Sequence, residues 1–159
     1  TGRACYLEEK KDKERLLAIA KASSSLPYVC PITYVDGRPM LDGGIVDSIP
    51  VLRAIEQGYE RNVVVLTRNR GYRKSEKDIR VPRFIYTRYP RLRVVLSRRC
   101  QVYNQQLEMI ERMEDEGRII AIRPEQRVVV NRIEKDIRKL TSLYEEGYAC
   151  AEKVMGQFL

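Results

Sequence analysis

The chain has 159 residues, of which 33% are charged, and it carries a formal net charge of +8 at pH 7. This length suits one domain with a real core, and no apolar run approaches the length that spans a bilayer. The chain has no histidine and no C-x-x-C pair, which argues against a zinc site and excludes an imidazole general base within it. No secretory signal is visible, and we expect a cytoplasmic protein with reduced cysteines at Cys5, Cys30, Cys100 and Cys150.

The first predicted helix runs from about Lys13 to Ala22. Asp12 precedes it as a suitable N-cap, and Glu14 lies in the first turn, where the helix dipole favours an acid. The three consecutive serines that follow, together with Pro27, end the helix. The apolar spacing predicts an inward face made of Leu16, Ile19 and Ala20.

A hairpin and a short helix are predicted next. Residues 28–37 read as a strand, interrupted by a proline, that turns at Asp36-Gly37, and residues 38–41 return from that turn. A short helix begins at Pro50 and ends near Gly58. Residues 62–69 form a β-branched run without alternation, which predicts a strand buried on both faces, as in a parallel sheet covered by helices.

The second half is predicted to be mostly helical. A long helix extends from about Leu92 to Gly117, an apolar strand covers residues 118–124, and an amphipathic helix ends the chain. We expect the apolar stripes of both helices to pack in the core. The stripe of the long helix consists of Leu92, Val95, Leu96, Val102, Tyr103, Leu107, Ile110 and Met113. The stripe of the last helix consists of Ile133, Ile137, Leu140, Tyr144, Tyr148 and Ala151. This alternation of helices and strands predicts a three-layer α/β domain.

Asp42 is followed by two glycines at the end of a predicted strand. In α/β sheets, chemistry gathers at the strand ends, and glycines there permit φ > 0 and leave room for another backbone or a substrate. An ordinary turn is the simpler interpretation of a bare D-G-G. A metal site made of Asp36, Asp42 and Asp47 is not favoured, because their spacing fits no calcium loop.

The surroundings of Asp42 favour the functional interpretation. Ala22-Ser23 stands upstream and is followed by Pro27, while a proline-led helix and the strand "VVVLT" stand downstream. This order resembles the patatin-like phospholipases, which are serine acyl hydrolases, over about residues 1–68. Residues 90–159 resemble the C-terminal tail of the bacterial branch, which is a less specific signal.

The resemblance implies acyl-transfer chemistry without histidine, metal or cofactor. In these enzymes an aspartate of the D-G-G motif takes the proton of a serine directly as general base. Asp42 matches that aspartate, and Gly43 and Gly44 match the glycines that shape its turn. A lipid or ester substrate follows from the same resemblance.

One departure from the family pattern is serious. The family nucleophile lies in a G-x-S-x-G elbow, and none of the serines in this chain has those flanking glycines. In the family the elbow and the oxyanion loop precede the D-G-G, and Thr1-Gly2 resembles a mid-domain hairpin. We therefore expect residues 1–159 to be the C-terminal portion of one patatin-like domain. Its fold would be an incomplete three-layer α/β fold of the acyl transferase/lysophospholipase type, with a base, no nucleophile and no activity alone.

A second function remains open, that of a non-catalytic basic module. Residues 61–99 hold thirteen Lys or Arg and only two acids, Glu76 and Asp78, so they could meet an anionic membrane or nucleic acid. A solvated basic face is the simpler interpretation, and the absence of a recognisable nucleic-acid motif makes that partner the less favoured one. A membrane-docking rim would consist of Arg68, Arg70, Arg73 and Lys74, and would make the protein peripheral to the membrane. The sequence does not indicate an oligomeric state.

Overall fold

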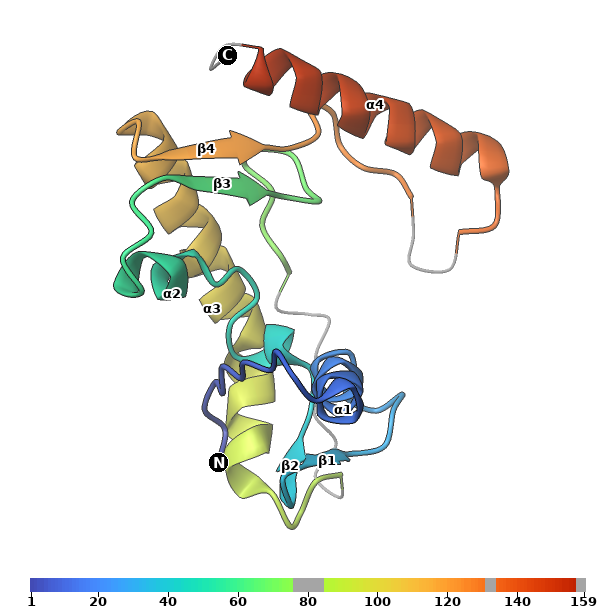
Figure 1. The fold of residues 1–159 in the computed structure, drawn as a ribbon. Helices are drawn as coiled ribbons and strands as arrows, with labels where there is room; N and C mark the ends of the chain where they lie inside the picture. The colour runs from blue at the N-terminus through green and yellow to red at the C-terminus, as the bar shows by residue number, and fades with distance from the viewer. Residues whose placement is uncertain (76–84, 131–133, 157–159) are drawn as a thin grey trace. The chain divides into compact units, whose positions relative to one another are not determined.

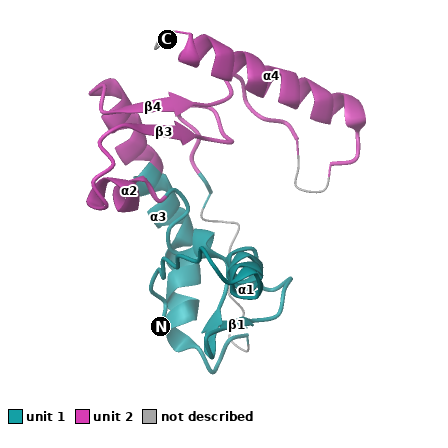
Figure 2. Cartoon of the chain, viewed as in Figure 1, with its two compact units in different colours: residues 1–49, 74–106 teal, residues 50–73, 107–159 magenta. Residues whose placement is uncertain are grey.

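The computed structural model describes residues 1–75, 85–130 and 134–156 (Figure 1). The elements in chain order are α1 (Lys13–Ser23), β1 (Thr33–Val35), β2 (Arg38–Met40), the 3-10 turn η1 (Gly43–Ile45), α2 (Val51–Glu56), β3 (Asn62–Val65), α3 (Pro90–Asp115), β4 (Ile119–Ile122) and α4 (Ile137–Met155). They form two compact units, unit 1 with residues 1–49 and 74–106 and unit 2 with residues 50–73 and 107–159 (Figure 2). Helix α3 contributes its first part to unit 1 and its last part to unit 2. Of the helices described, none is long and apolar enough to cross a membrane.

Helix α1 begins where the sequence predicts. The Asp12 carboxylate accepts hydrogen bonds from the N–H groups of Glu14 and Arg15, which satisfies two of the free donors of the first turn. The predicted inward face is wrong in part, because Leu16 and Ala20 are exposed. The less exposed face carries Ala22, which is buried, and Arg15, which lies about two turns earlier on the same side. Arg15 forms ion pairs with Glu9 and Asp36.

The hairpin of unit 1 confirms the predicted turn. Strands β1 and β2 pair antiparallel, with Val35 opposite Arg38, around Asp36 at φ 50° and Gly37 at φ 70°. Two positive φ values are what a two-residue loop needs to match the twist of its strands. The strand begins only at Thr33, because Tyr28 has a positive φ of 69° and residues 27–29 form a turn. The first eight residues contain no strand.

The sheet of unit 2 is parallel, as predicted, but it is not buried on both faces. Strands β3 and β4 pair with Val63 opposite Ile120 and Val65 opposite Ile122. Val64 is buried, whereas Val65 is 71% exposed and Val63 is 50% exposed. A run of β-branched residues is compatible with burial on both faces, but it does not show what covers them. In the described part of the chain only one face of β3 is covered, so the prediction of burial on both faces is wrong. Helices and strands alternate as an α/β chain requires, while the three-layer arrangement stays a prediction.

Helix α3 supplies core residues to each unit. Leu96 and Cys100 are buried in unit 1, and Leu107, Ile110 and Met113 are buried in unit 2. The predicted apolar stripe of this helix is therefore confirmed at these leucine, isoleucine and methionine positions. Gly117, at φ 68°, follows the helix end and lets the chain turn into β4.

The predicted core stripe of α4 is wrong. Ile137 is 76% exposed and Tyr144 is 72% exposed, and Leu140 and Tyr148 are exposed as well. Cys150, which lies on a different face of the helix, is the buried residue of α4. The periodicity showed that the helix is amphipathic, but the helix contacts β4 with another face. Ile133 lies outside the described residues.

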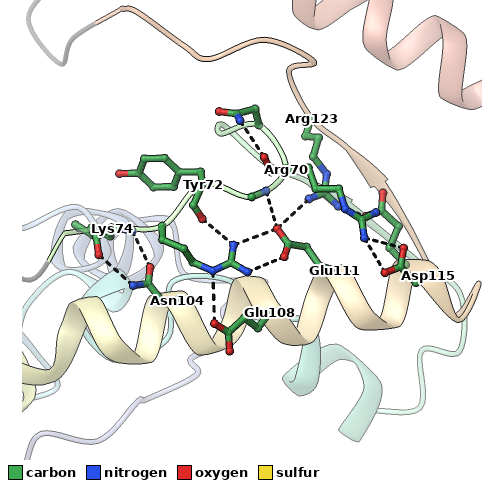
Figure 3. Close-up of polar contacts among 12 residues, drawn as sticks. Arg70, Tyr72, Lys74, Asn104, Glu108, Glu111, Asp115 and Arg123 are labelled. Atoms are coloured by element: carbon green, nitrogen blue, oxygen red, sulfur yellow. Dashed lines mark hydrogen bonds and ion pairs between the residues drawn. The ribbon is translucent and has the colours of Figure 1, made fainter.

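A cluster of ion pairs holds residues 70–73 to α3 within unit 2 (Figure 3). The Arg70 guanidinium donates to both Asp115 oxygens at 2.8 and 2.7 Å, and Arg73 Nη2 donates to Glu111 Oε2 at 2.7 Å. The Gly71 N–H donates to Glu111 Oε1 at 2.9 Å. Glu111, with a side chain only 16% exposed, therefore receives both a guanidinium and a backbone donor.

These donors change the titration of Glu111. The hydrogen bond from Arg73, the Gly71 N–H and the charges of Arg73 and Arg123 lower the pKa of Glu111 from an ordinary 4.5 to about 2. Because the folded-state pKa lies below the unfolded one, ionised Glu111 stabilises the fold fully above about pH 4.5. That contribution is lost as the pH falls towards 2.

Replacing Glu111 by Gln should flatten the acid limb of the stability curve. We expect the free energy of unfolding at pH 7 to fall by about 2 kcal/mol, a typical value for hydrogen bonds to a charged group. Between pH 5 and pH 2 the variant should lose less stability than the parent chain, because it has no carboxylate to protonate. Urea unfolding followed by circular dichroism across this pH range measures both quantities.

Arg73→Gln supplies the matched variant. If the two residues act as one pair, this variant should show part of the same flattening, because the Gly71 N–H and Arg123 still act on Glu111, and the double variant should lose less than the sum of the two single losses. Additive losses, or an unchanged acid limb in Glu111→Gln, would contradict the assignment.

Candidate functional site

Asp42 lies two residues after the end of β2, at the N-cap of η1. Its Oδ1 accepts a hydrogen bond of 2.7 Å from the Gly44 N–H, and its own N–H donates to Ser25 O at 2.9 Å. The residue is half-buried. The carboxylate is therefore folded back over the two glycines, as in an Asx turn, rather than extended into solvent.

The second glycine leaves room for the Asp42 carboxylate itself. A Cβ atom on Gly44 would lie 2.9 Å from Asp42 Oδ1, which is closer than such atoms approach. On Gly43 the nearest atom would be Ser23 Oγ at 3.9 Å, an ordinary contact. Neither glycine has a positive φ, so the expectation that they serve φ > 0 is wrong. A glycine is required at position 44 for a steric reason, because a side chain there would collide with the Asp42 carboxylate.

Ser25 ties the preceding motif to Asp42. Its side chain is buried, and its hydroxyl donates to Lys21 O at 2.7 Å and lies 2.8 Å from Thr33 Oγ1. Its carbonyl accepts the Asp42 N–H. The end of α1, the start of β1 and Asp42 thus meet at one serine. Sequence reasoning named the Ala22-Ser23 motif but missed this serine, whose only signal was its place inside the run of serines before Pro27.

Helix α3 holds the loop after Asp42 within unit 1. Arg99 Nε donates to Gly44 O at 3.1 Å, and Ser48 Oγ donates to the same oxygen at 2.7 Å. Gln106 Nε2 donates to Asp47 Oδ1 at 2.6 Å, while Gln106 Oε1 accepts the Ser48 N–H at 3.2 Å. Arg99 and Gln106 are seven residues apart and so lie on one face of the helix. The sequence did not point to either residue, because no local pattern links them to a loop more than 50 residues away.

Asp47 has a structural role that differs from that of Asp42. Both Asp47 oxygens are occupied, one by Gln106 and the other by the hydroxyl of Tyr6. By contrast, Asp42 Oδ2 makes no hydrogen bond with any of the residues that the structure describes. A carboxylate oxygen without a donor can accept a proton from a substrate or a nucleophile. Within the same residues, the Asp42 carboxylate bonds no serine hydroxyl.

No metal-binding arrangement occurs among the described residues. In those parts of the chain, no group of three or more Cys, Asp or Glu side chains is placed to hold an ion. Asp36 pairs with Arg15, and Asp42 and Asp47 bind the partners given above. All four cysteines are free thiols, with Cys100 and Cys150 buried.

The predicted basic rim is not a bare cationic surface. Arg70 and Arg73 pair with acids of α3, and Arg68 lies over the ring of Tyr72 at 5.1 Å. Lys74 Nζ lies 5.7 Å from the ring of Tyr103 in unit 1, and the Lys74 backbone is bound by Asn104. Part of the basic stretch, residues 76–84 with Glu76 and Asp78, lies outside the described residues.

Two family models match the chain. Residues 6–55 match the model of the patatin-like phospholipases, and residues 89–159 match a domain of unknown function (DUF6363). The first match covers Ser25, Asp42 and Gly44, and it supports a lipid hydrolase family in general terms. Arg99 and Gln106 fall in the second match. No curated protein and no solved structure matches the chain.

Gly44→Ala should destabilise unit 1 more than Gly43→Ala. The new methyl group would displace the Asp42 carboxylate and break its bond to the Gly44 N–H, at a cost of about 1–2 kcal/mol. Gly43→Ala meets only ordinary contacts and should change the free energy of unfolding by about 0.5 kcal/mol or less. Urea unfolding of the two variants measures the difference, and equal losses would contradict the steric role of Gly44.

Proposed function

We propose that this chain supplies the general base, Asp42, of a patatin-like serine acyl hydrolase that cleaves ester bonds in lipids. The observation that carries the proposal is a half-buried Asp42 whose Oδ2 accepts no hydrogen bond from the described residues, within the segment that matches the patatin-like phospholipase model. The absence of histidine from the chain is compatible with this chemistry, because the carboxylate acts directly on the serine.

The two oxygens of Asp42 have separate roles in this proposal. Oδ1 stays bonded to the Gly44 N–H, which fixes the direction of the carboxylate. Oδ2 accepts the proton of a serine hydroxyl as that oxygen attacks the ester carbonyl, and then returns the proton to the leaving alcohol. In deacylation, Oδ2 accepts a proton from water as the water oxygen attacks the acyl-enzyme carbonyl, and then returns the proton to the serine oxygen.

The nucleophile is proposed to come from sequence other than these residues. None of the serines lies in a G-x-S-x-G elbow, and none described binds the Asp42 carboxylate. The chain alone should therefore have no hydrolytic turnover. The alternative of a basic module acting through residues 61–99 is not favoured, because Arg70 and Arg73 are neutralised by the acids of α3.

Asp42→Asn in the complete enzyme tests the proposal. Asparagine keeps the size and an oxygen that can accept the Gly44 N–H, but it removes the basicity. We expect hydrolysis of a short-chain p-nitrophenyl ester to fall by about two to four orders of magnitude, the usual contribution of a positioned general base. Circular dichroism should show that the variant folds as the parent does.

Asp36→Asn is the matched control. It removes a nearby carboxylate at a positive-φ position that asparagine tolerates, and it should leave turnover within about twofold of the parent while weakening the pair with Arg15. Near-parental turnover by folded Asp42→Asn would refute the role of Asp42. Turnover by the 159-residue chain alone would refute the external nucleophile.

A further inference from the structure

Helix α4 has two apolar faces, and the residues that the structure describes cover only one of them. The covered face includes the buried Cys150 with the half-buried Leu143 and Val154, and the helix contacts β4. The other face, called here the outer stripe, consists of Ile137, Leu140, Tyr144, Tyr148, Ala151 and Met155. All of these are exposed except Ala151, which is half-buried.

The outer stripe runs straight along the helix. Its residues are spaced by three, four, four, three and four, so Tyr148, Ala151 and Met155 repeat the first three members eleven residues later. An 11-residue repeat gives about 3.67 residues per turn, close to the period of an undistorted α-helix. The stripe therefore stays on one side for about 27 Å, at about 1.5 Å per residue. Such a surface fits another straight helix.

The order of residues in the stripe nearly matches its own reverse. In an antiparallel pair of α4 helices, Ile137 of one copy lies level with Met155 of the other, and Tyr144 lies level with Tyr148. Leu140 falls opposite Ala151, so a large residue meets a small one. Gly147 lies between the outer stripe and the covered face, and a Cβ atom added there would meet no atom within 4 Å, so the helix surface next to Tyr144 is open. A self-complementary patch of this kind closes as a two-fold dimer.

The charges beside the stripe fit the same arrangement. Arg138 and Glu152 lie on the same flank, so each approaches the other type in the second copy, once on each side of the two-fold axis. Glu145 lies on the same flank between these two positions, and it approaches its own copy near the two-fold axis while exposed to solvent. As a whole α4 has three basic residues (Arg138, Lys139, Lys153) and three acidic ones (Glu145, Glu146, Glu152). A neutral helix gains little from an anionic lipid surface.

We propose that the outer stripe of α4 is a homodimer interface, in which the α4 helices of two copies of this chain pack antiparallel. A tyrosine covers roughly 150–250 Å² when fully buried, so four tyrosines with their aliphatic neighbours cover on the order of 1,000 Å². This is the lower limit for a specific interface. The dimer is therefore concentration-dependent, with a dissociation constant on the order of micromolar.

Analytical ultracentrifugation of the 159-residue chain over a concentration series tests the dimer. The parent chain should shift from monomer to dimer as the concentration rises. Tyr144→Glu should raise the dissociation constant tenfold or more, because it places a charge in the middle of the seam. Ser142→Glu adds the same charge to the polar face of the same helix and should leave the constant unchanged, while circular dichroism confirms that both variants keep their helices.

Disulfide trapping tests the antiparallel register. In a chain whose accessible Cys5 and Cys30 are replaced by Ser, we introduce Tyr144→Cys or Tyr148→Cys. A mixture of the two variants should form a 144–148 disulfide-linked heterodimer on mild oxidation, since a disulfide needs Cα atoms within about 7 Å. Neither variant alone should cross-link efficiently.

Three outcomes would overturn the proposal. The first is a parent chain that remains monomeric up to its solubility limit. The second is cross-linking of each cysteine variant with itself, which indicates parallel helices. The third is binding to neutral lipid vesicles that Tyr144→Glu abolishes in a chain that stays monomeric, which would assign the stripe to a lipid surface.

Discussion

The polar contacts from Arg99 and Gln106 to the loop after Asp42 are the constraint on which the candidate site depends. The carbonyl of Gly44 accepts from Arg99 and Ser48, and the N–H of Gly44 donates to Asp42. Both polar groups of one glycine are thereby fixed, and the carboxylate is fixed with them. Because these anchors lie on α3, the segment that matches a domain of unknown function holds the loop of the segment that matches the patatin-like phospholipases. A turn of two glycines would otherwise be among the most mobile parts of a chain.

Two aspartates five residues apart differ in how hydrogen bonds occupy their carboxylates. Asp47 has both oxygens occupied and fastens the loop to Gln106 and Tyr6. Asp42 has one oxygen bound, which sets its direction, and one oxygen without a donor among the described residues. The first arrangement suits stability, and the second suits proton transfer. Composition cannot distinguish them, because both are Asp residues in a short polar loop.

The neighbours of a charged or apolar residue decide whether that residue contributes to the surface of the protein. Arg70 and Arg73 belong to a strongly basic stretch of sequence, yet each is held by a carboxylate of α3. The net charge of a segment therefore overstates the cationic surface that it presents. In α4 the reverse holds, since residues with a core-like period remain exposed and the helix uses a neighbouring face to contact β4.

The sequence by itself determined the local features. The Asp12 cap, the turn at Asp36-Gly37, the parallel pairing expected for β3 and the core positions of α3 each depend on neighbouring residues or on a helical period, and these features formed as expected. It also singled out Asp42 with its glycines. Only the tertiary structure decided which face of β3 and of α4 is covered, because an apolar pattern specifies a face that can be buried but not what covers it. It also decided why Gly44 is a glycine and which side chains hold the loop, since Ser25, Arg99 and Gln106 act across distances in sequence that no local signal spans.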